Sequence, residues 1–92
     1  MIRGSLNDGG LKYARWDGTA WDIQIIDSRG GDDLCLAFDA FDNPAIAYTN
    51  EGVRLARWTG AGWDVKTVAF DATVESLAFG PDGNLGIAYL NE

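Results

Sequence analysis

Short apolar stretches separated by turn residues run along the whole chain, and they predict strands rather than helices. In one stretch Leu36 and Phe38 alternate with Cys35 and Ala37, so large and small apolar side chains fall on opposite faces of an extended chain. Asp-Gly, Asn-Pro and glycine-rich segments, which favour turns, lie between the stretches. The pattern predicts an all-β chain of eight strands. The expected strands cover residues 11–16, 21–27, 34–38, 45–49, 53–58, 63–69, 74–79 and 85–90.

The strand pattern occurs twice along the chain. Residues 11–16, which end in Ala-Arg-Trp, return 42 residues later as residues 53–58, and residues 43–51 return 41 residues later as residues 84–92. Repeats of roughly 40–50 residues made of short strands are typical of β-propeller blades. The sequence therefore predicts a β-propeller fold with two four-stranded blade repeats of about 42 residues per chain.

The strands form pairs of two kinds. Apolar inner pairs are expected at residues 34–49 and 74–90, and more polar outer pairs at residues 11–27 and 53–69. The first outer pair has no inner pair before it, and the last inner pair has no outer pair after it. A second copy placed head to tail would supply each missing half-blade. We therefore expect homo-oligomeric ring closure with strands shared between subunits, as a homotrimer of about six blades or a homotetramer of about eight.

Composition supports burial between subunits. Hydrophobic residues make up 47% of the chain, which is more than a slab of two blades could cover. At 92 residues the chain is one domain at most. The two-blade unit is expected at residues 6–92, because residues 1–5 resemble an initiator methionine followed by residues left from a tag or linker. Residues 6–8, Leu-Asn-Asp, also resemble residues 90–92, Leu-Asn-Glu, as though one copy continued into the next.

Charge excludes several classes of partner. The net charge is −7, which does not suit binding to nucleic acid or to an anionic membrane surface.

The chain has no histidine, so metal sites and catalytic triads that use histidine are excluded. No apolar stretch approaches the ~20 residues of a membrane helix, and no signal-peptide core follows the first residues. The compartment is therefore unknown, with cytoplasmic expression as the default.

The chain resembles bacterial β-propeller repeats. The resemblance rests on Leu-Ala-Phe-Asp at residues 36–39, on Asn-Pro-Ala-Ile-Ala-Tyr at residues 43–48 and on the Arg-Trp hairpin that follows. It covers nearly all of residues 6–92 and implies the fold without implying an activity.

The two outer hairpins carry the candidate binding residues. Residues 15–21 (Arg-Trp-Asp-Gly-Thr-Ala-Trp) and 57–63 (Arg-Trp-Thr-Gly-Ala-Gly-Trp) resemble the hairpins of small fucose-binding lectins, in which two-blade chains trimerise. Those lectins also have an acidic residue shortly before the first Trp, where this chain has Tyr13 and Leu55. The resemblance implies a carbohydrate site at Arg15, Trp16, Trp21, Arg57, Trp58 and Trp63. The alternative is that the Trp residues pack across each hairpin as aromatic pairs.

No residue is expected to be catalytic. Glycosidases need two positioned carboxylates, and acids repeated in each blade, such as Asp22 and Asp64, are more typical of turns. Cys35 lies in an apolar stretch and is expected to be a small packed side chain rather than a nucleophile. Oxygen-bearing Asp39, Asp42 and Asn43 have ligand chemistry suited to Ca²⁺, but the second copy lacks the first Asp, which favours a turn. We expect no metal and no cofactor.

These observations predict a self-assembling β-propeller fragment, a minimal or engineered scaffold for structure or binding, with no catalytic activity of its own. The tag-like start of the chain and the split blade favour this interpretation. A carbohydrate-binding lectin is the first alternative, and a glycosidase-like propeller enzyme is the second.

Overall fold

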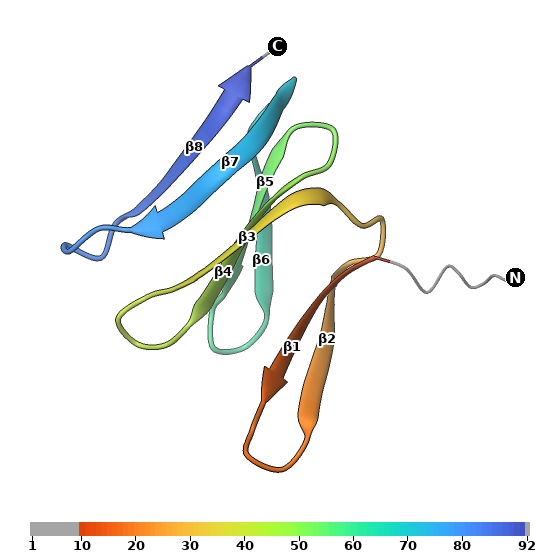
Figure 1. The fold of residues 1–92 in the computed structure, drawn as a ribbon, viewed down its shortest axis with the longest axis vertical. Helices are drawn as coiled ribbons and strands as arrows, with labels where there is room; N and C mark the ends of the chain where they lie inside the picture. The colour runs from red at the N-terminus through yellow and green to blue at the C-terminus, as the bar shows by residue number, and fades with distance from the viewer. Residues whose placement is uncertain (1–9, 92) are drawn as a thin grey trace, which may run out of the picture. The chain divides into compact units, whose positions relative to one another are not determined.

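The computed structural model describes residues 10–91, and all regular structure in this part is β-strand (Figure 1). The expected scar at residues 1–5 and the Leu-Asn-Asp segment at residues 6–8 lie outside the described residues. No helix long and apolar enough to cross a membrane occurs between residues 10 and 91. The strands are β1 (Leu11–Trp16), β2 (Trp21–Asp27), β3 (Asp32–Phe38), β4 (Pro44–Thr49), β5 (Val53–Trp58), β6 (Trp63–Ala69), β7 (Ala72–Phe79) and β8 (Leu85–Asn91).

The chain divides into two compact units, Met1–Gly31 and Asp32–Glu92. The described part of the first unit is one antiparallel hairpin, β1–β2. The second unit holds a four-stranded antiparallel sheet in the order β3-β4-β5-β6 and a separate hairpin, β7–β8. The expected inner pair β3–β4 and outer pair β5–β6 therefore belong to one four-stranded sheet.

The sequence repeat is also a structural repeat. The pairing of β1 with β2 is irregular between Leu11 and Lys12, and that of β5 with β6 is irregular at the equivalent place, between Val53 and Arg54. β3 and β7 each carry an irregularity as well, between Asp32 and Cys35 in one and between Val74 and Ser76 in the other. A β-bulge bends a strand and changes its twist, so matching bulges give equivalent strands the same shape.

Two strands, β3 and β7, begin two residues earlier than the sequence pattern predicts. The loop expected at residues 28–33 ends two residues sooner, because Asp32 pairs with Thr49 of β4. Asp33, which follows, has a left-handed φ of 54° and lies within the irregular segment. β7 likewise starts at Ala72, which pairs with Asn91. Polar composition predicted a loop at the first place, but cross-strand pairing extends the strand through it.

The core of the second unit forms where β7 lies across β3 and β4 (Figure 1). Ala47 of β4 and Val53 of β5 are fully buried against Val74 of β7. The hydroxyl of Thr49 accepts a hydrogen bond from the backbone N–H of Val74 at 3.0 Å. Small and branched apolar side chains of both sheets thus meet in this core, which contains Ala72 as well as Val74 of β7. The partly buried residues packed around this core are Cys35, Ala69, Leu77 and Ile87.

Among the inner strands β3, β4, β7 and β8, only β4 is buried on both faces in a single copy. Residues 44–48 of β4 are all buried, whereas Leu36 and Phe38 on the large-residue face of β3 are 52% and 42% exposed. Tyr89 and Leu90 of β8 are also exposed. β3 and β8 are not buried on both faces in a single copy, because a strand is buried on both faces only where a sheet covers each face.

Gly52 closes the turn between β4 and β5 and should tolerate no side chain. Its φ is 124°, and a Cβ there would lie 2.5 Å from the carbonyl oxygen of Ala69. We expect Gly52→Ala to lower the free energy of unfolding by about 1–3 kcal/mol, from backbone strain and the clash. Denaturant unfolding at a fixed protein concentration measures it. Gly62→Ala is the matched control, since a Cβ at Gly62 meets nothing within 4 Å. Equal unfolding midpoints for the two variants would contradict this account.

Candidate functional site

The Trp residues of each outer hairpin pack against each other. Trp16 lies directly opposite Trp21, and Trp58 directly opposite Trp63, at the turn end of each hairpin. In both pairs the ring centroids are 5.6 Å apart, with interplanar angles of 62° and 63°. Edge-to-face contact of this kind is a favoured geometry for aromatic pairs. The structure therefore gives each Trp a packing partner in its own hairpin.

A side-chain oxygen closes each of these turns. The Asp17 carboxylate accepts hydrogen bonds from the backbone N–H groups of Thr19 at 2.7 Å and Ala20 at 2.8 Å. In the second hairpin the hydroxyl of Thr59 accepts two bonds at 3.3 Å, from the N–H groups of Ala61 and Gly62. Asp and Thr differ in charge but fill the same role, because both place an acceptor oxygen over the turn. The turn therefore holds the two Trp residues opposite each other.

Arg57 and Trp58 do not meet on one face of their hairpin. Adjacent residues of a strand point to opposite faces, and Arg57 lies opposite Asp64 in the sheet. The guanidinium carbon of Arg57 is 5.3 Å from the centroid of the Phe79 ring, in cation–π geometry. A sugar site needs an aromatic face and hydrogen-bonding groups around the same ligand. The geometry of β5–β6 therefore supports the packing interpretation of its Trp residues.

A shallow hollow of about 230 Å³ lies on the Arg57 face of β5–β6. Leu55 lies opposite Lys66 there, and Arg57 opposite Asp64. Lys66 Nζ is 3.6 Å from an Asp64 carboxylate oxygen, but both side chains are largely exposed, so this ion pair contributes little. One aliphatic side chain, Leu55, and three charged ones, Arg57, Asp64 and Lys66, line this hollow.

Asp39 and its neighbours, whose oxygens have ligand chemistry suited to Ca²⁺, form a turn. An Asp39 carboxylate oxygen accepts hydrogen bonds from the N–H groups of Phe41 at 2.8 Å and Asn43 at 2.9 Å. In the second copy Asp82 accepts from the N–H and the side-chain amide of Asn84, at 3.0 and 2.8 Å. These contacts confirm the turn interpretation. Across residues 10–91 no group of three or more His, Cys, Asp or Glu residues is placed to hold a metal ion.

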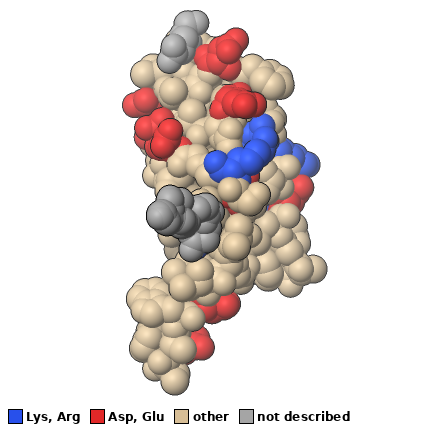
Figure 2. All heavy atoms as spheres, turned by 90° about the vertical axis from the view of Figure 1, so that its right-hand side faces the viewer, with Lys and Arg blue, Asp and Glu red and all other residues tan. Residues whose placement is uncertain are grey.

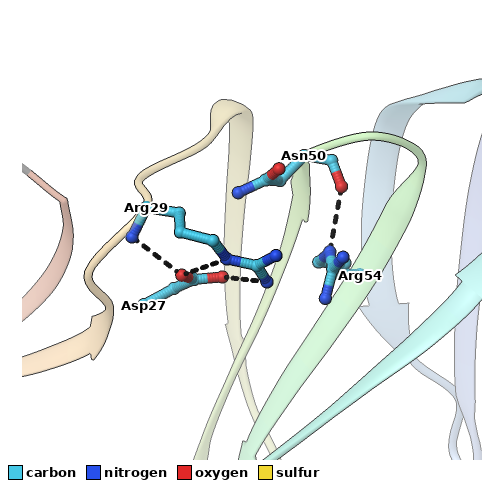
Figure 3. Close-up of polar contacts among 4 residues, drawn as sticks. All are labelled: Asp27, Arg29, Asn50 and Arg54. Atoms are coloured by element: carbon cyan, nitrogen blue, oxygen red, sulfur yellow. Dashed lines mark hydrogen bonds and ion pairs between the residues drawn. The ribbon is translucent and has the colours of Figure 1, made fainter.

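Other charged residues fix loops. The Asp27 carboxylate accepts from the backbone N–H of Arg29 at 3.0 Å and from its guanidinium at 3.3 and 3.4 Å. In the second unit Arg54 Nε donates to the carbonyl oxygen of Asn50 at 2.9 Å, next to the turn between β4 and β5 (Figure 3). Uncharged residues cover most of the face drawn in Figure 2. The charges that the site could use are thus largely engaged in holding the chain's own turns.

Reasoning from the sequence missed Phe79 as the partner of Arg57, and Leu55 and Lys66 as walls of the hollow. The cross-strand register, which places Leu55 opposite Lys66, could have been derived from the hairpin turn that begins at Thr59. The contact between Arg57 and Phe79 had no signal in the sequence, because it joins strands of different sheets.

Acid should destabilise the fold through Asp39. The backbone N–H groups of Asn43 and Phe41 favour the ionised carboxylate, so the pKa of Asp39 lies below its ordinary value. The folded state therefore releases this proton more readily than the unfolded state. That contribution to stability is present at neutral pH and is lost as pH falls through the lowered pKa.

We expect Asp39→Asn, which keeps an acceptor oxygen but cannot titrate, to lose less stability between pH 6 and pH 3 than the parent chain. Unfolding curves across that range measure it. Glu75→Gln, at an exposed position of β7, removes the same charge without touching the turn and serves as the control. A parent and an Asp39→Asn variant with the same pH dependence would refute the role of this carboxylate.

The Trp58–Trp63 contact should appear as a coupling energy. We expect a double-mutant cycle with Trp58→Leu and Trp63→Leu to give about 0.5–1.5 kcal/mol of coupling, because each variant removes the same edge-to-face contact. Denaturant unfolding of the four proteins provides the measurement. Strictly additive losses would mean that the two rings contribute independently.

Comparison with known proteins gives no relative from which a function could be transferred. No protein-family model matches the chain. Neither the curated proteins nor the solved structures contain a significant match. The function must therefore be inferred from the residues and geometry described above.

Proposed function

We propose that this chain is a subunit of a self-assembling β-propeller, in which copies complete each other's half-blades, and that it serves as a structural or binding scaffold without catalytic activity of its own. The observation that carries the proposal is the pairing of equivalent strands. In the four-stranded sheet, β4 pairs with β3 and β5, and β5 pairs with β4 and β6. By the sequence repeat β8 corresponds to β4, and β1 corresponds to β5. Among the described strands β8 pairs only with β7, and β1 only with β2.

The unpaired sides of β8 and β1 are the two that the repeat predicts should be paired. β7 and β2 also have open edges, but their equivalents β3 and β6 have open edges in the complete sheet as well. An open strand edge exposes backbone N–H and C=O groups that can pair with another chain. A second copy can supply β1 to β8, and the repeat of this contact closes a ring when the rotation per subunit permits it.

Exposed apolar residues support a partner of the same kind. Ile23 and Ile25 of β2 are 61% and 63% exposed, and Leu90 of β8 is 59% exposed. Such exposure on sheet faces and at an edge strand is costly in water and typical of obligate interfaces. Propellers have roughly 4–8 blades, so three copies giving about six blades, or four giving about eight, both fit two repeats per chain.

Carbohydrate binding has less support. Arg57 contacts Phe79 on one face of its hairpin, and Trp58 packs with Trp63 on the other. The charged side chains of the turns are engaged as acceptors and donors for the backbone. Catalysis would need a nucleophile or an acid–base pair around a common substrate position, and the hollow beside β5 offers only an exposed ion pair.

The oligomeric state tests the proposal. We expect native mass spectrometry, with light scattering over a dilution series, to give three or four times the 9.9 kDa mass of one chain. The melting temperature should rise with protein concentration, since folding and assembly are coupled. A 9.9 kDa monomer that melts cooperatively at every concentration would contradict the proposal.

A matched pair of variants separates assembly from general loss of apolar surface. Leu90→Lys places a charge on the edge strand β8, and lysine at an edge opposes strand pairing. We expect it to raise the concentration of half-dissociation by roughly tenfold or more, equal to about 1.4 kcal/mol. Phe41→Lys removes a more exposed aromatic ring, in the turn between β3 and β4, and should leave the mass unchanged.

A further inference from the structure

We propose that β8 of one copy pairs with β1 of the next copy in the register of β4 with β5, so that Gly86 lies opposite the partner's Arg15. This inference rests on the proposed assembly and specifies its contact residue by residue. Within the chain the β4–β5 register places Ala45 opposite Arg57, Ile46 opposite Ala56, Ala47 opposite Leu55, Tyr48 opposite Arg54 and Thr49 opposite Val53.

The start of β1 already has the geometry of a strand that follows such a turn. Gly52, which precedes β5, has a φ of 124° and approaches the carbonyl oxygen of Ala69. Gly10, which precedes β1, has a φ of 113°, and a Cβ there would lie 2.9 Å from the carbonyl oxygen of Asp27. Asp27 is the counterpart of Ala69 in the repeat. β1 therefore begins as β5 does.

The hairpins on both sides of the proposed contact also repeat their counterparts. Leu77 lies opposite Ile87 in β7–β8, as Leu36 lies opposite Ile46 in β3–β4. Trp16 lies opposite Trp21 in β1–β2, as Trp58 lies opposite Trp63 in β5–β6. Because both halves keep the internal register of the complete sheet, the register between them can be transferred from it.

The transferred register pairs a small residue with a large one at three of its five positions. It places Ile87 opposite the partner's Ala14, Ala88 opposite the partner's Tyr13, and Tyr89 opposite the partner's Lys12. The last pair reproduces the aromatic–cation pairing of Tyr48 with Arg54. A slip of one residue would turn every side chain of β1 to the other face. The two remaining pairs of this register are Gly86 with the partner's Arg15 and Leu90 with the partner's Leu11.

The same register extends an interface that the chain already contains. Ile87 packs against the core on the face of the four-stranded sheet that carries Ala47. In the proposed sheet, Ile87 of β8 lies opposite the partner's Ala14. The partner's Ala14 in turn lies opposite the partner's Ile23, so these three residues share one face of the sheet. In the four-stranded sheet, Leu55 of β5 lies opposite Ala47 on the face against which Ile87 packs. Leu55 also lines the hollow, so the hollow lies on that face. The partner's exposed isoleucines would then cover the hollow.

Disulfide trapping tests the register. We would place Arg15→Cys and Gly86→Cys together in a Cys35→Ala background, since Cys35 is the one cysteine of the chain. Directly opposed residues of an antiparallel pair have Cα atoms about 4.5–5.5 Å apart, within the range of a disulfide. The control combines Arg15→Cys with Ala88→Cys, which lie on the same face but two residues apart in register, at about 7–8 Å.

We expect the first pair to form intermolecular disulfides at least roughly tenfold more efficiently than the control pair, on non-reducing gels and by intact mass. Native mass under reducing conditions is measured first for each variant. A second pair, Lys12→Cys with Tyr89→Cys, reports on the opposite face of the sheet if the Gly86→Cys variant fails to assemble.

The outcomes distinguish the two proposals. Oligomers in which the control pair cross-links better, or in which neither designed pair cross-links, would overturn the register and leave the assembly standing. A parent chain that stays monomeric at every concentration would overturn both. Cross-linking of the designed pairs in a species of three or four chains would support both.

Discussion

The second unit depends on the packing of large apolar side chains of β7 and β8 against small ones of β3, β4 and β5. An isolated two-stranded hairpin is marginal in water, so β7–β8 is held mainly by this contact, together with the hydrogen bond from the backbone N–H of Val74 to the hydroxyl of Thr49. Val74 and Ile87 can approach closely because Ala47 leaves room beside the buried Val53. Protein interiors are close-packed, so the alternation of small and large residues fixes which faces can meet. Among the strands that the structure describes, β8 pairs with β7 on one side only.

The open edge of β8 is the feature on which the proposed assembly depends. The backbone N–H and C=O groups of an edge strand can pair with another strand. In the proposed assembly that strand is β1 of a second copy, which is equivalent to β5. Pairing between copies would extend the sheet of β7–β8 outward and cover apolar residues such as Ile23 and Ile25, which one copy leaves exposed. Stability, assembly and function would then be inseparable, as in obligate oligomers.

The charged residues have local roles that agree with a scaffold. Asp39 and Asp82 accept backbone hydrogen bonds within turns, and Arg54 donates to the carbonyl oxygen of Asn50. Arg57 lies over Phe79 of the packed hairpin. Asp39, Asp82 and Arg54 fix loops, and Arg57 also lines the shallow hollow beside β5. The net charge of −7 does not favour binding to nucleic acid.

The sequence by itself determined the strands, the repeat and the pairing of inner and outer strands, because these follow from local turn chemistry and alternation with a period of two residues. It also determined that Asp39 forms a turn, since Asp and Asn at these spacings bond to their own backbone. Only the tertiary structure decided that β3 starts at Asp32, that β4 alone is buried on both faces, and that Arg57 contacts Phe79. These features depend on which sheet lies against which face, and contacts between strands distant in sequence leave no periodic signal in a single chain.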